Sequence, residues 1–512
     1  MRFGAGAAAA NVDPPLGLPM VGVVRRPEGA RERLGALEVT AAAFERDGAR
    51  VVICGVDTLG IQAPEADDLR ARIAERTGAA RAGILLNWNH THHAPPGGRT
   101  VYGSFGERDA LPDDDTLRYI EQLHDAIVAT AAAACERLED AWVRCGLGYA
   151  DLAINRRQRD PDGLVRRLGW HPEGLVDRSV PVLQSLRPDG SAIATIVGYG
   201  AHTVTTGVEY IGYSPDYPGW LRESLRQLTG GECVYLQGAS GNVMPLVAFD
   251  DSNQEPQRMG RRLALEAAHA IADRDAVPTG IAETGFGSGS PVVLFRREPR
   301  AGVPPALAAV EQEVDFPLLP LPSPAEIAAE FARAERELAE AEAAGASEAE
   351  LRIVRYHGFN WARRTRAEIE SGSPRTSARG AICALRIGDA AIVTGPGEIF
   401  TEIGLAVKER SPADVTFYAG YSNGCISYMP TASEYPLGGY EPAYGHKTYG
   451  LPAQVAPETE RLLIDTGVRL VRSLFREREA PAVDGWLATG ALPVPPAPSH
   501  PERPPLPPAD AA

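Results

Sequence analysis

The 512-residue sequence lacks any run of about 20 consecutive apolar residues, the length that a helix needs to span a bilayer. Its first residues, MRFGAGAAAANVDPP, lack the apolar segment of a secretory signal peptide. The six cysteines are scattered and form no Cys-x-x-Cys pair, which argues against a disulfide framework. We therefore expect a cytoplasmic protein whose thiols are reduced and mostly buried.

Positive charge is scarce relative to negative charge. The formal net charge is −16 and the isoelectric point is about 5.2. A surface this acidic repels phosphate backbones and anionic lipids, so we expect no nucleic-acid partner. Hydrophobic residues make up 44% of the chain and charged residues 23%, values close to globular averages, which predict an ordinary folded core.

Apolar strand-like segments alternate with helix-like segments along most of the chain, which predicts an α/β (mixed α+β) fold. We expect one large domain over residues 1–488. Residues 325–372 are rich in Ala, Glu and Arg and are predicted to form a helical hairpin within it. Residues 489–512 are dense in proline and are predicted to be a disordered tail.

Several apolar strands end in short loops that carry otherwise rare polar residues. These loops contain His90 to His93, His202, Ser240 to Asn242, Glu398, and Asn423 to Tyr428. Sites in α/β proteins gather at the carboxyl ends of strands. We therefore expect these five strand ends to converge on one pocket.

The stretch NHTHHAPPGG holds three of the ten histidines. In an extended strand His90 and His92 face the same side, so both imidazoles could reach one zinc ion. A histidine-rich surface turn explains the local sequence equally well. His202 taken alone is more often structural than a ligand, and Glu398 could simply favour a helix start.

Other candidate positions also have ordinary explanations. Tyr428 would usually be an aromatic core residue. Asn155 and Arg156, in the stretch AINRRQRD, would usually be solvated.

Four blocks in a fixed order resemble the catalytic domain of the neutral/alkaline, non-lysosomal ceramidase family. They are NHTHHAPPG, GAHTVTTG, GPGEIFTEIG and YSNGCISYMPTASEYPLGGYE, and the resemblance runs from about Val12 to Glu477. The resemblance implies a single domain of ceramidase-like fold with a zinc site at the carboxyl ends of its strands. Family members also carry a C-terminal β-sandwich domain and an export signal, and we expect neither in this chain.

The resemblance also implies roles for individual residues. The zinc ligands fall on His90, His202, Glu398 and Tyr428. His92 becomes a catalytic partner beside the substrate carbonyl, together with Tyr428, and Arg156 orients the substrate. An Asn-Arg block of the family falls on Asn155 and Arg156. Asn155, Asn242 and Asn423 are the predicted substrate-binding residues.

One block departs from the family pattern. The family sequence GDVSP is GNVMP here, so Asn242 replaces an aspartate and Met244 replaces a serine. A mechanism in which zinc activates water needs no serine nucleophile. We therefore predict an enzyme that uses one zinc ion per chain to hydrolyse the amide bond of a small N-acyl or lipid-like substrate.

Three alternatives to this prediction stay open. The chain could be a true ceramidase, which should expose apolar residues around the mouth of its pocket. It could be a degenerate family member that binds a ligand without turnover. A third alternative is an amidohydrolase-type barrel with a His-x-His on its first strand.

Overall fold

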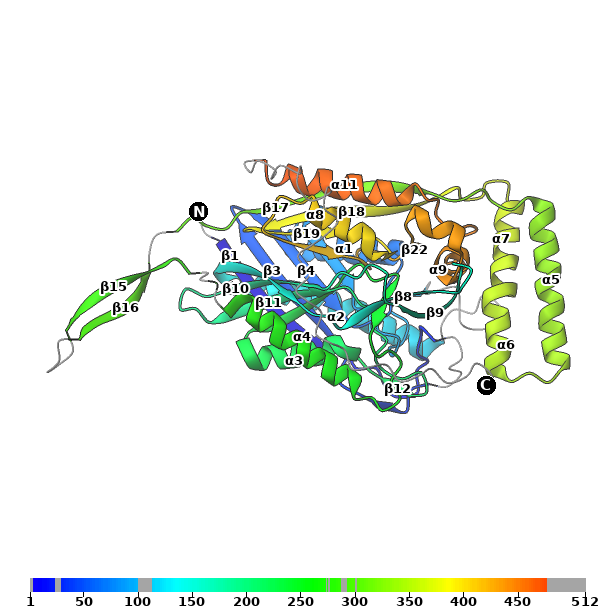
Figure 1. The fold of residues 1–512 in the computed structure, drawn as a ribbon, viewed down its shortest axis with the longest axis horizontal. Coiled ribbons are helices and arrows are strands. Elements are labelled where there is room, and N and C mark those ends of the chain that lie inside the picture. Colours follow the sequence, from blue (N-terminus) through cyan, green and yellow to red (C-terminus); the bar gives the residue numbers. More distant parts are fainter. Residues whose placement is uncertain are drawn as a thin grey trace.

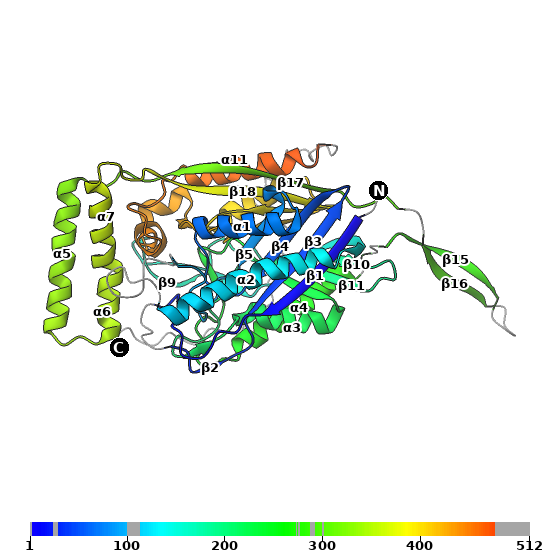
Figure 2. The ribbon, with the colours of Figure 1, turned by 180° about the vertical axis from the view of Figure 1, so that it is seen from behind.

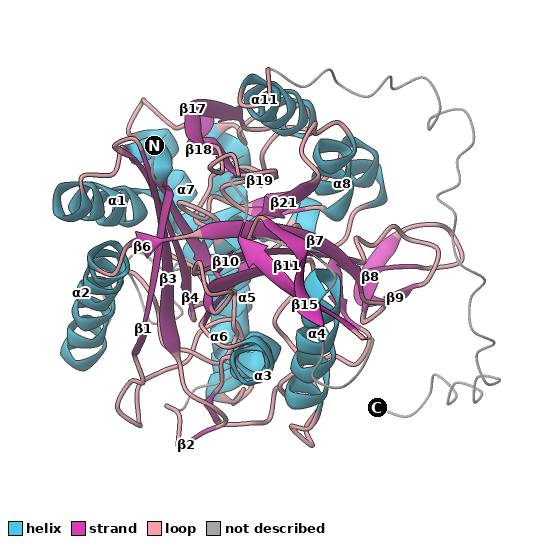
Figure 3. Cartoon of the chain, turned by 90° about the vertical axis from the view of Figure 1, so that its left-hand side faces the viewer, coloured by secondary structure: helices cyan, strands magenta, loops and turns pink. Residues whose placement is uncertain are grey.

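Three β-sheets form the body of the protein, and each sheet carries helices on its outer face (Figure 1). This computed structural model describes residues 3–23, 29–99, 113–272, 274, 277–286, 292–299 and 302–476. Seen end-on in Figure 3, helices α1 and α2 lie on one side of the body, α3 and α4 on a second, and α8 and α11 on a third. The mixed α/β class predicted from the sequence is confirmed.

The first sheet has the strand order β5-β4-β3-β1-β6. Its strands are β1 (Phe3–Asn11), β3 (Glu38–Arg46), β4 (Ala49–Val56), β5 (Ile84–Trp88) and β6 (Glu139–Asp140). Helices α1 (Ala63–Thr77) and α2 (Asp114–Glu136) cover its outer face, as Figure 2 shows from behind. The sequence of residues 63–78 and 112–141 predicts amphipathic helices with acidic residues early, and both helices lie within these segments.

The other two large sheets have four strands each. The second, β13-β11-β10-β7, packs against α3 (Asp216–Thr229) and α4 (Glu255–Ala272), and the third, β17-β18-β19-β21, packs against α8 (Thr401–Glu409) and α11 (Thr459–Ser473). Their strands are β7 (Trp142–Tyr149), β10 (Ser179–Leu186), β11 (Ala192–Tyr199), β13 (Glu232–Gln237), β17 (Leu307–Pro317), β18 (Ser377–Ile387), β19 (Ala390–Thr394) and β21 (Val415–Ala419).

The inner faces of the three sheets share one hydrophobic core. Ile53 of the first sheet, Ile196 of the second and Ile392 of the third belong to the same buried cluster. Successive residues of a strand point to opposite faces, so Val52 and Cys54 belong instead to the cluster under α1 and α2. Each sheet is therefore buried on both sides, which explains why its strands read as nearly continuous apolar runs.

Each large sheet contains one parallel pair of strands: β4–β5, β11–β13 and β19–β21. Parallel neighbours end at the same edge of a sheet, so the loops that follow them start side by side. These are the loops that carry the polar residues singled out in the sequence. The three-sheet arrangement brings them to one place.

Smaller elements complete the structure. The short strands are β2 (Glu32–Arg33), β8 (Ala153–Arg159), β9 (Val165–His171), β12 (Gly212–Tyr213), β14 (Val243–Pro245), β15 (Thr279–Phe286), β16 (Val293–Pro299), β20 (Glu398–Ile399) and β22 (Tyr428–Met429). The remaining helices are η1 (Arg81–Gly83), α5 (Pro324–Ala343), α6 (Glu348–Val354), η2 (Arg355–Phe359), α7 (Asn360–Glu370), η3 (Ala432–Leu437), α9 (Tyr440–Ala443) and α10 (Gly445–Thr448).

Helix α5 runs antiparallel to the continuous segment of α6, η2 and α7 at one end of the molecule, where the sequence predicts a helical hairpin (Figure 1). The β15–β16 ribbon extends from the other end. None of the sheets in the described part of the chain is an eight-stranded parallel barrel, which removes the amidohydrolase-barrel alternative. No described helix combines the length and apolar character that a membrane crossing requires. The predicted tail, residues 489–512, lies outside the described residues.

Candidate metal centre

His90 lies two residues beyond the end of β5, in a strained backbone conformation. Its φ is +65°, a left-handed value that residues other than glycine seldom adopt. The turn is fixed because the His90 amide donates to Thr58 O at 3.0 Å and its Nδ1 donates to Leu59 O at 2.7 Å. Strain of this kind persists where the surrounding structure holds a side chain in a functional position.

His202 follows the neighbouring parallel pair, three residues beyond the end of β11. Its backbone amide donates to Val243 O at 3.0 Å, and its Nδ1 donates to Ser240 O at 2.7 Å. Both acceptors lie in the loop and short strand after β13. The two ends of the β11–β13 pair therefore position this imidazole together.

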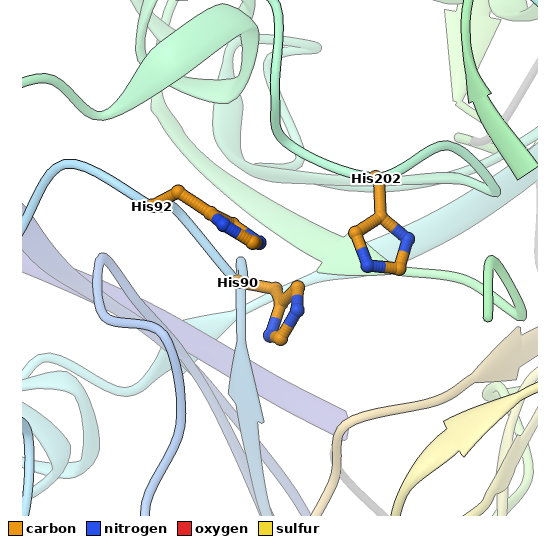
Figure 4. A group of neighbouring side chains, drawn as sticks. All are labelled: His90, His92 and His202. Atoms are coloured by element: carbon orange, nitrogen blue, oxygen red, sulfur yellow. The ribbon is translucent and has the colours of Figure 1, made fainter. Parts of the chain in front are cut away.

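The rings of His90, His92 and His202 lie around a common centre (Figure 4). One ligand nitrogen from each lies within 4.8 Å of the other two. Each ring donates Nδ1–H to a backbone carbonyl, and for His92 the acceptor is Gly22 O at 3.0 Å. A carbonyl can only accept, so in the neutral form of each ring the lone pair lies on Nε2. This is how proteins orient metal-binding histidines.

Glu398 adds a carboxylate to this group. Its Oε2 lies 3.0 Å from His202 Nε2 and 3.4 Å from His90 Nε2. Two ligands bound at 2.0–2.1 Å to a tetrahedral zinc ion lie about 3.4 Å apart. Both nitrogen–oxygen distances are therefore close to the spacing of two ligands on one zinc ion, and imidazole and carboxylate are ligands that zinc accepts.

Two tyrosines hold the Glu398 carboxylate in place. The Tyr449 hydroxyl donates a hydrogen bond to Glu398 Oε1, and the Tyr421 hydroxyl donates one to Oε2 at 3.3 Å. The Tyr421 ring also lies against the His90 ring, with 4.5 Å between the centroids. These contacts set the rotation of the carboxylate, so that Oε2 faces the imidazoles.

Electrostatics favour ligand-competent protonation states. Burial, assisted by the positive charge of Arg156, lowers the pKa of His202 to about 4, so this ring is neutral at pH 7. Burial alone would raise the pKa of Glu398, but His90 and His202 bring it well below its ordinary value. A neutral imidazole and an ionised carboxylate are the forms that bind metal ions.

Arg156 and Tyr428 lie together beside this group. The Arg156 side chain is buried, donating from Nη2 to the Tyr428 hydroxyl at 3.2 Å and from Nε to Glu441 at 2.9 Å. Burial and the nearby Glu398 charge raise the pKa of Tyr428 well above its ordinary value, so the hydroxyl keeps its proton. The local expectation of a solvated arginine is wrong. The ligand role of Tyr428 stays a prediction.

The three asparagines predicted to bind substrate are engaged by the protein itself. Asn155 donates to Leu175 O and accepts from the Arg157 amide. Asn242 accepts from the Thr401 amide at the start of α8, and Asn423 accepts from the Leu86 amide. These hydrogen bonds hold segments of the site in place, and the substrate-binding role of the three side chains stays a prediction.

His93 is buried and hydrogen bonded to the backbone away from the other two clustered histidines. Its Nε2 hydrogen bonds to Gly207 O at 3.0 Å and its ring lies near Tyr210, in the loop after His202. His92 belongs to the same group of three imidazoles as His90 and His202, and its predicted role beside the substrate stays a prediction. The geometry makes it a further candidate ligand.

Sequence reasoning missed three side chains of the site, Tyr421, Tyr449 and Glu441. It also missed the backbone carbonyls of Leu59, Gly22 and Ser240. Tyr421 and Glu441 lie inside or at the end of a block already quoted for its resemblance, YSNGCISYMPTASEYPLGGYE, so the signal was present there. Tyr449 follows in GHKTYG and carries no pattern of its own. Backbone carbonyls never show in a sequence.

The fold and the site together define an α/β protein with a buried histidine–carboxylate centre at the ends of three parallel strand pairs. No family model matches the sequence, and no curated protein matches it. Among solved structures, the chain is similar to neutral ceramidase from Pseudomonas aeruginosa, with a TM-score of 0.65 and 17% identity over 95% of this chain and 77% of that one. A ceramidase complexed with C2 gives the same TM-score and identity over 95% of this chain and 78% of that one.

The protein therefore has the fold of neutral ceramidase. The fold that the sequence resemblance implied is confirmed, although only about one residue in six is identical.

Proposed function

We propose that this protein is a zinc-dependent hydrolase that cleaves the amide bond of an N-acyl substrate. The single observation that carries the proposal is the group of His90, His202 and Glu398, whose spacing fits one zinc ion. The neutral-ceramidase fold supports the same reaction class, because it is the fold of an amide hydrolase.

His90, His202 and Glu398 would hold the zinc ion, with His92 or Tyr428 able to complete the set. When bound, the ion supplies a Lewis acid and a water of lowered pKa. If Tyr428 completes the set, His92 stays outside it beside His90, with 5.0 Å between the ring centroids. It could then take a proton from the attacking water and pass it to the leaving amine. Arg156, fixed by Glu441, would direct its charge toward the acyl carbonyl.

The change from serine to methionine at position 244 agrees with this mechanism. The Met244 side chain packs with Ile154 and Val204 in a small apolar cluster, where it offers no nucleophile. A mechanism based on activated water does not need one. We expect Met244→Ser to change the rate little.

Two rivals remain. A true ceramidase would hydrolyse detergent-dispersed ceramide, whereas our proposal favours smaller N-acyl compounds. A catalytically degenerate member of the family would bind one zinc ion per chain and hydrolyse none of the substrates.

The experiment is a measurement of metal content together with hydrolysis of a panel of N-acyl amides and esters of varied acyl length. We expect about one zinc per chain and release of the amine. His90→Ala and His202→Ala should lose the metal, whereas His93→Ala is the matched control and should keep it. Full zinc content in His202→Ala would refute the ligand set, and full zinc without turnover of any substrate would favour the degenerate member.

A further inference from the structure

Trp361 of α7 connects the helical hairpin to the body of the protein. The hairpin projects from one end of the molecule (Figure 1) and has a small apolar core of its own, which contains Ile327, Trp361 and Ala362. The Trp361 side chain also reaches out of the hairpin, because its Nε1 donates to Leu451 O at 2.9 Å, in the segment after α10. Only 8% of this residue is exposed, so the contact is a buried one.

Two residues of α10 pack on the same indole. The His446 ring lies edge-on to it, with 5.8 Å between the ring centroids, and Lys447 Nζ lies 4.1 Å from the centroid of the Trp361 ring. Burial, together with the charge of Lys447, lowers the pKa of His446 to about 3, so this ring is neutral and packs as an aromatic group. An ammonium group over the face of an indole is attracted by the ring. Trp361 therefore holds α10 by packing, by a cation–π contact and, just beyond the helix, by a hydrogen bond.

Residues 446–451 form a tight turn with Tyr449 in its middle. The His446 carbonyl accepts from the amides of Tyr449 and Leu451, each at 3.1 Å. Trp361 contacts both ends of this turn, the ring of His446 and the carbonyl of Leu451. The Tyr449 hydroxyl donates to Glu398 of the candidate metal centre. One turn therefore contacts the hairpin with its ends and the metal centre with its middle residue.

The segment that contains this turn has little means of holding its shape alone. Helices α9 and α10 have four residues each, whereas an isolated helix in water is marginal below about 12–15 residues. Gly450 has a φ of +66°, which ends any helical run. The position of Tyr449 must therefore be set by the elements that pack on the segment, and Trp361 is placed to do this at both ends of the turn.

We propose that Trp361 is a positioning residue for the candidate metal centre. It fixes the turn of residues 446–451, and through the turn it fixes the Tyr449 hydroxyl that orients Glu398. The helical hairpin thereby acts on the centre through a residue that does not touch the metal ligands. The effect on metal binding rests on the proposed function, which places zinc at Glu398, whereas the effect on the turn does not.

The first test is the zinc affinity of the full chain, measured by competition with a chromophoric chelator. Trp361→Ala removes the support from both ends of the turn and should weaken zinc binding about tenfold, as expected when a ligand loses the group that orients it. Trp361→Phe keeps a ring against His446 and should recover part of the affinity. A Trp361→Ala protein that binds zinc like the unchanged protein would overturn the proposal.

Phe331→Ala is the matched control within the hairpin. The Phe331 ring packs against Phe359 and under Arg366, both of which belong to the hairpin itself. This variant should lower the melting temperature through lost packing and leave zinc affinity unchanged. Equal losses of zinc affinity in Phe331→Ala and Trp361→Ala would contradict the proposal, because they would reflect general damage to the hairpin.

A double-mutant cycle with Tyr449→Phe separates positioning from a general loss of stability. If Trp361 acts through the Tyr449 hydroxyl, Trp361→Ala should cost no further zinc affinity once that hydroxyl is gone, so the two losses should not add. Fully additive losses would show that Trp361 does not act through Tyr449.

Hydrogen exchange of the metal-free protein tests the turn without zinc. The amides of residues 446–451 should exchange faster in Trp361→Ala than in the unchanged protein, because the turn then opens more often, and Phe331→Ala should leave them unchanged. Unaltered exchange of this segment in Trp361→Ala would overturn the proposal.

The failure of this inference and the failure of the proposed function are distinguishable. A non-additive cycle and faster exchange in the turn, without hydrolysis of any amide, would support the role of Trp361 and refute the hydrolase. Hydrolysis of an N-acyl amide by Trp361→Ala with unchanged zinc affinity would support the hydrolase and overturn the role of Trp361.

Discussion

Backbone carbonyls decide which nitrogen each clustered histidine presents. Leu59, Gly22 and Ser240 each accept from Nδ1, so the Nε2 atoms of His90, His92 and His202 are the ones available to a metal ion. Side chains then orient the carboxylate, with Tyr449 and Tyr421 on the two oxygens of Glu398. The groups that hydrogen bond to the candidate ligands therefore shape the site as much as the ligands do.

Tyr449→Phe removes one of these partners without changing the ring. Glu398 Oε1 then loses its hydrogen bond, the carboxylate can rotate, and zinc affinity should fall about 10–100-fold. Competition with a chromophoric chelator measures the change. Tyr444→Phe is the matched control because Tyr444 is 53% exposed, and it should bind zinc like the unchanged protein. Unaltered affinity in Tyr449→Phe would show that the hydrogen bond does not position the carboxylate.

Glu402 gives a prediction for the dependence of stability on pH. Burial raises its pKa from the ordinary 4.5 to about 7, and Asn242 Nδ2 donates to its carboxylate at 2.9 Å. Between these two pKa values the folded protein binds more protons at this group than the unfolded chain does. The free energy of unfolding therefore falls as pH rises from about 4.5 to 7, by on the order of 1–2 kcal/mol for a group that still reaches solvent.

Glu402→Gln should abolish this share of the pH dependence. The amide keeps the volume and an accepting oxygen but cannot ionise. Urea unfolding at pH 4.5 and pH 8 should give similar stabilities for the two proteins at the lower pH and a more stable variant at the higher pH. A variant that is less stable at pH 8 would mean that the ionised carboxylate stabilises the fold.

At the scale of elements, the loop after β13 and the short strand β20 approach each other very closely. The Gly241 amide donates to Ile399 O at 2.7 Å, and a Cβ atom at Gly241 would lie 2.4 Å from Glu398 O. Only glycine permits this contact. The position of Glu398 therefore depends on a residue in the second sheet's connection, more than 150 positions earlier in the sequence.

Gly241→Ala should push β20 away from the loop. We expect a loss of about 1–3 kcal/mol in the free energy of unfolding, as for overpacked sites, together with reduced zinc content. Gly358→Ala is the control, because a Cβ there would meet only Ala334 Cβ at 3.5 Å within a helical segment. Urea unfolding followed by circular dichroism compares the two. A Gly241→Ala protein with normal stability would refute the close-contact argument.

Elements also differ in how well the sequence predicted them. The sequence predicts helices over residues 63–78, 112–141, 254–275 and 457–477, and α1, α2, α4 and α11 lie within these segments. Helix α3 (Asp216–Thr229) was missed, because its start in SPDYPGW carries two prolines and a glycine that are typical of a turn. Packing of Tyr217, Leu221 and Leu225 against the second sheet overrides that local signal.

At the scale of the whole molecule, the candidate centre joins three sheets. His90 follows the first sheet, His202 the second and Glu398 the third, so a zinc ion at this point would connect all three. Binding energy of such an ion adds to folding stability, because the site does not exist in the unfolded chain.

Zinc should therefore raise the melting temperature. At a free concentration of 1,000 times its dissociation constant the stabilisation is about 4 kcal/mol. Scanning calorimetry of the metal-free and zinc-loaded proteins measures the shift, and His202→Ala, lacking a ligand, should show none. An equal shift in His202→Ala would place the stabilising zinc elsewhere.

The cytoplasmic location expected from the sequence stays a prediction.

The sequence by itself determined the class of fold, the succession of strands and helices, and the short list of polar residues at strand ends, because periodicity and local composition are properties of neighbouring residues. It placed His90, His202 and Glu398 on that list. Only the tertiary structure decided that these three meet, that Arg156 is buried beside them, and which backbone groups the asparagines hold. Those facts depend on contacts between residues more than a hundred positions apart, which arise when three sheets pack on one core.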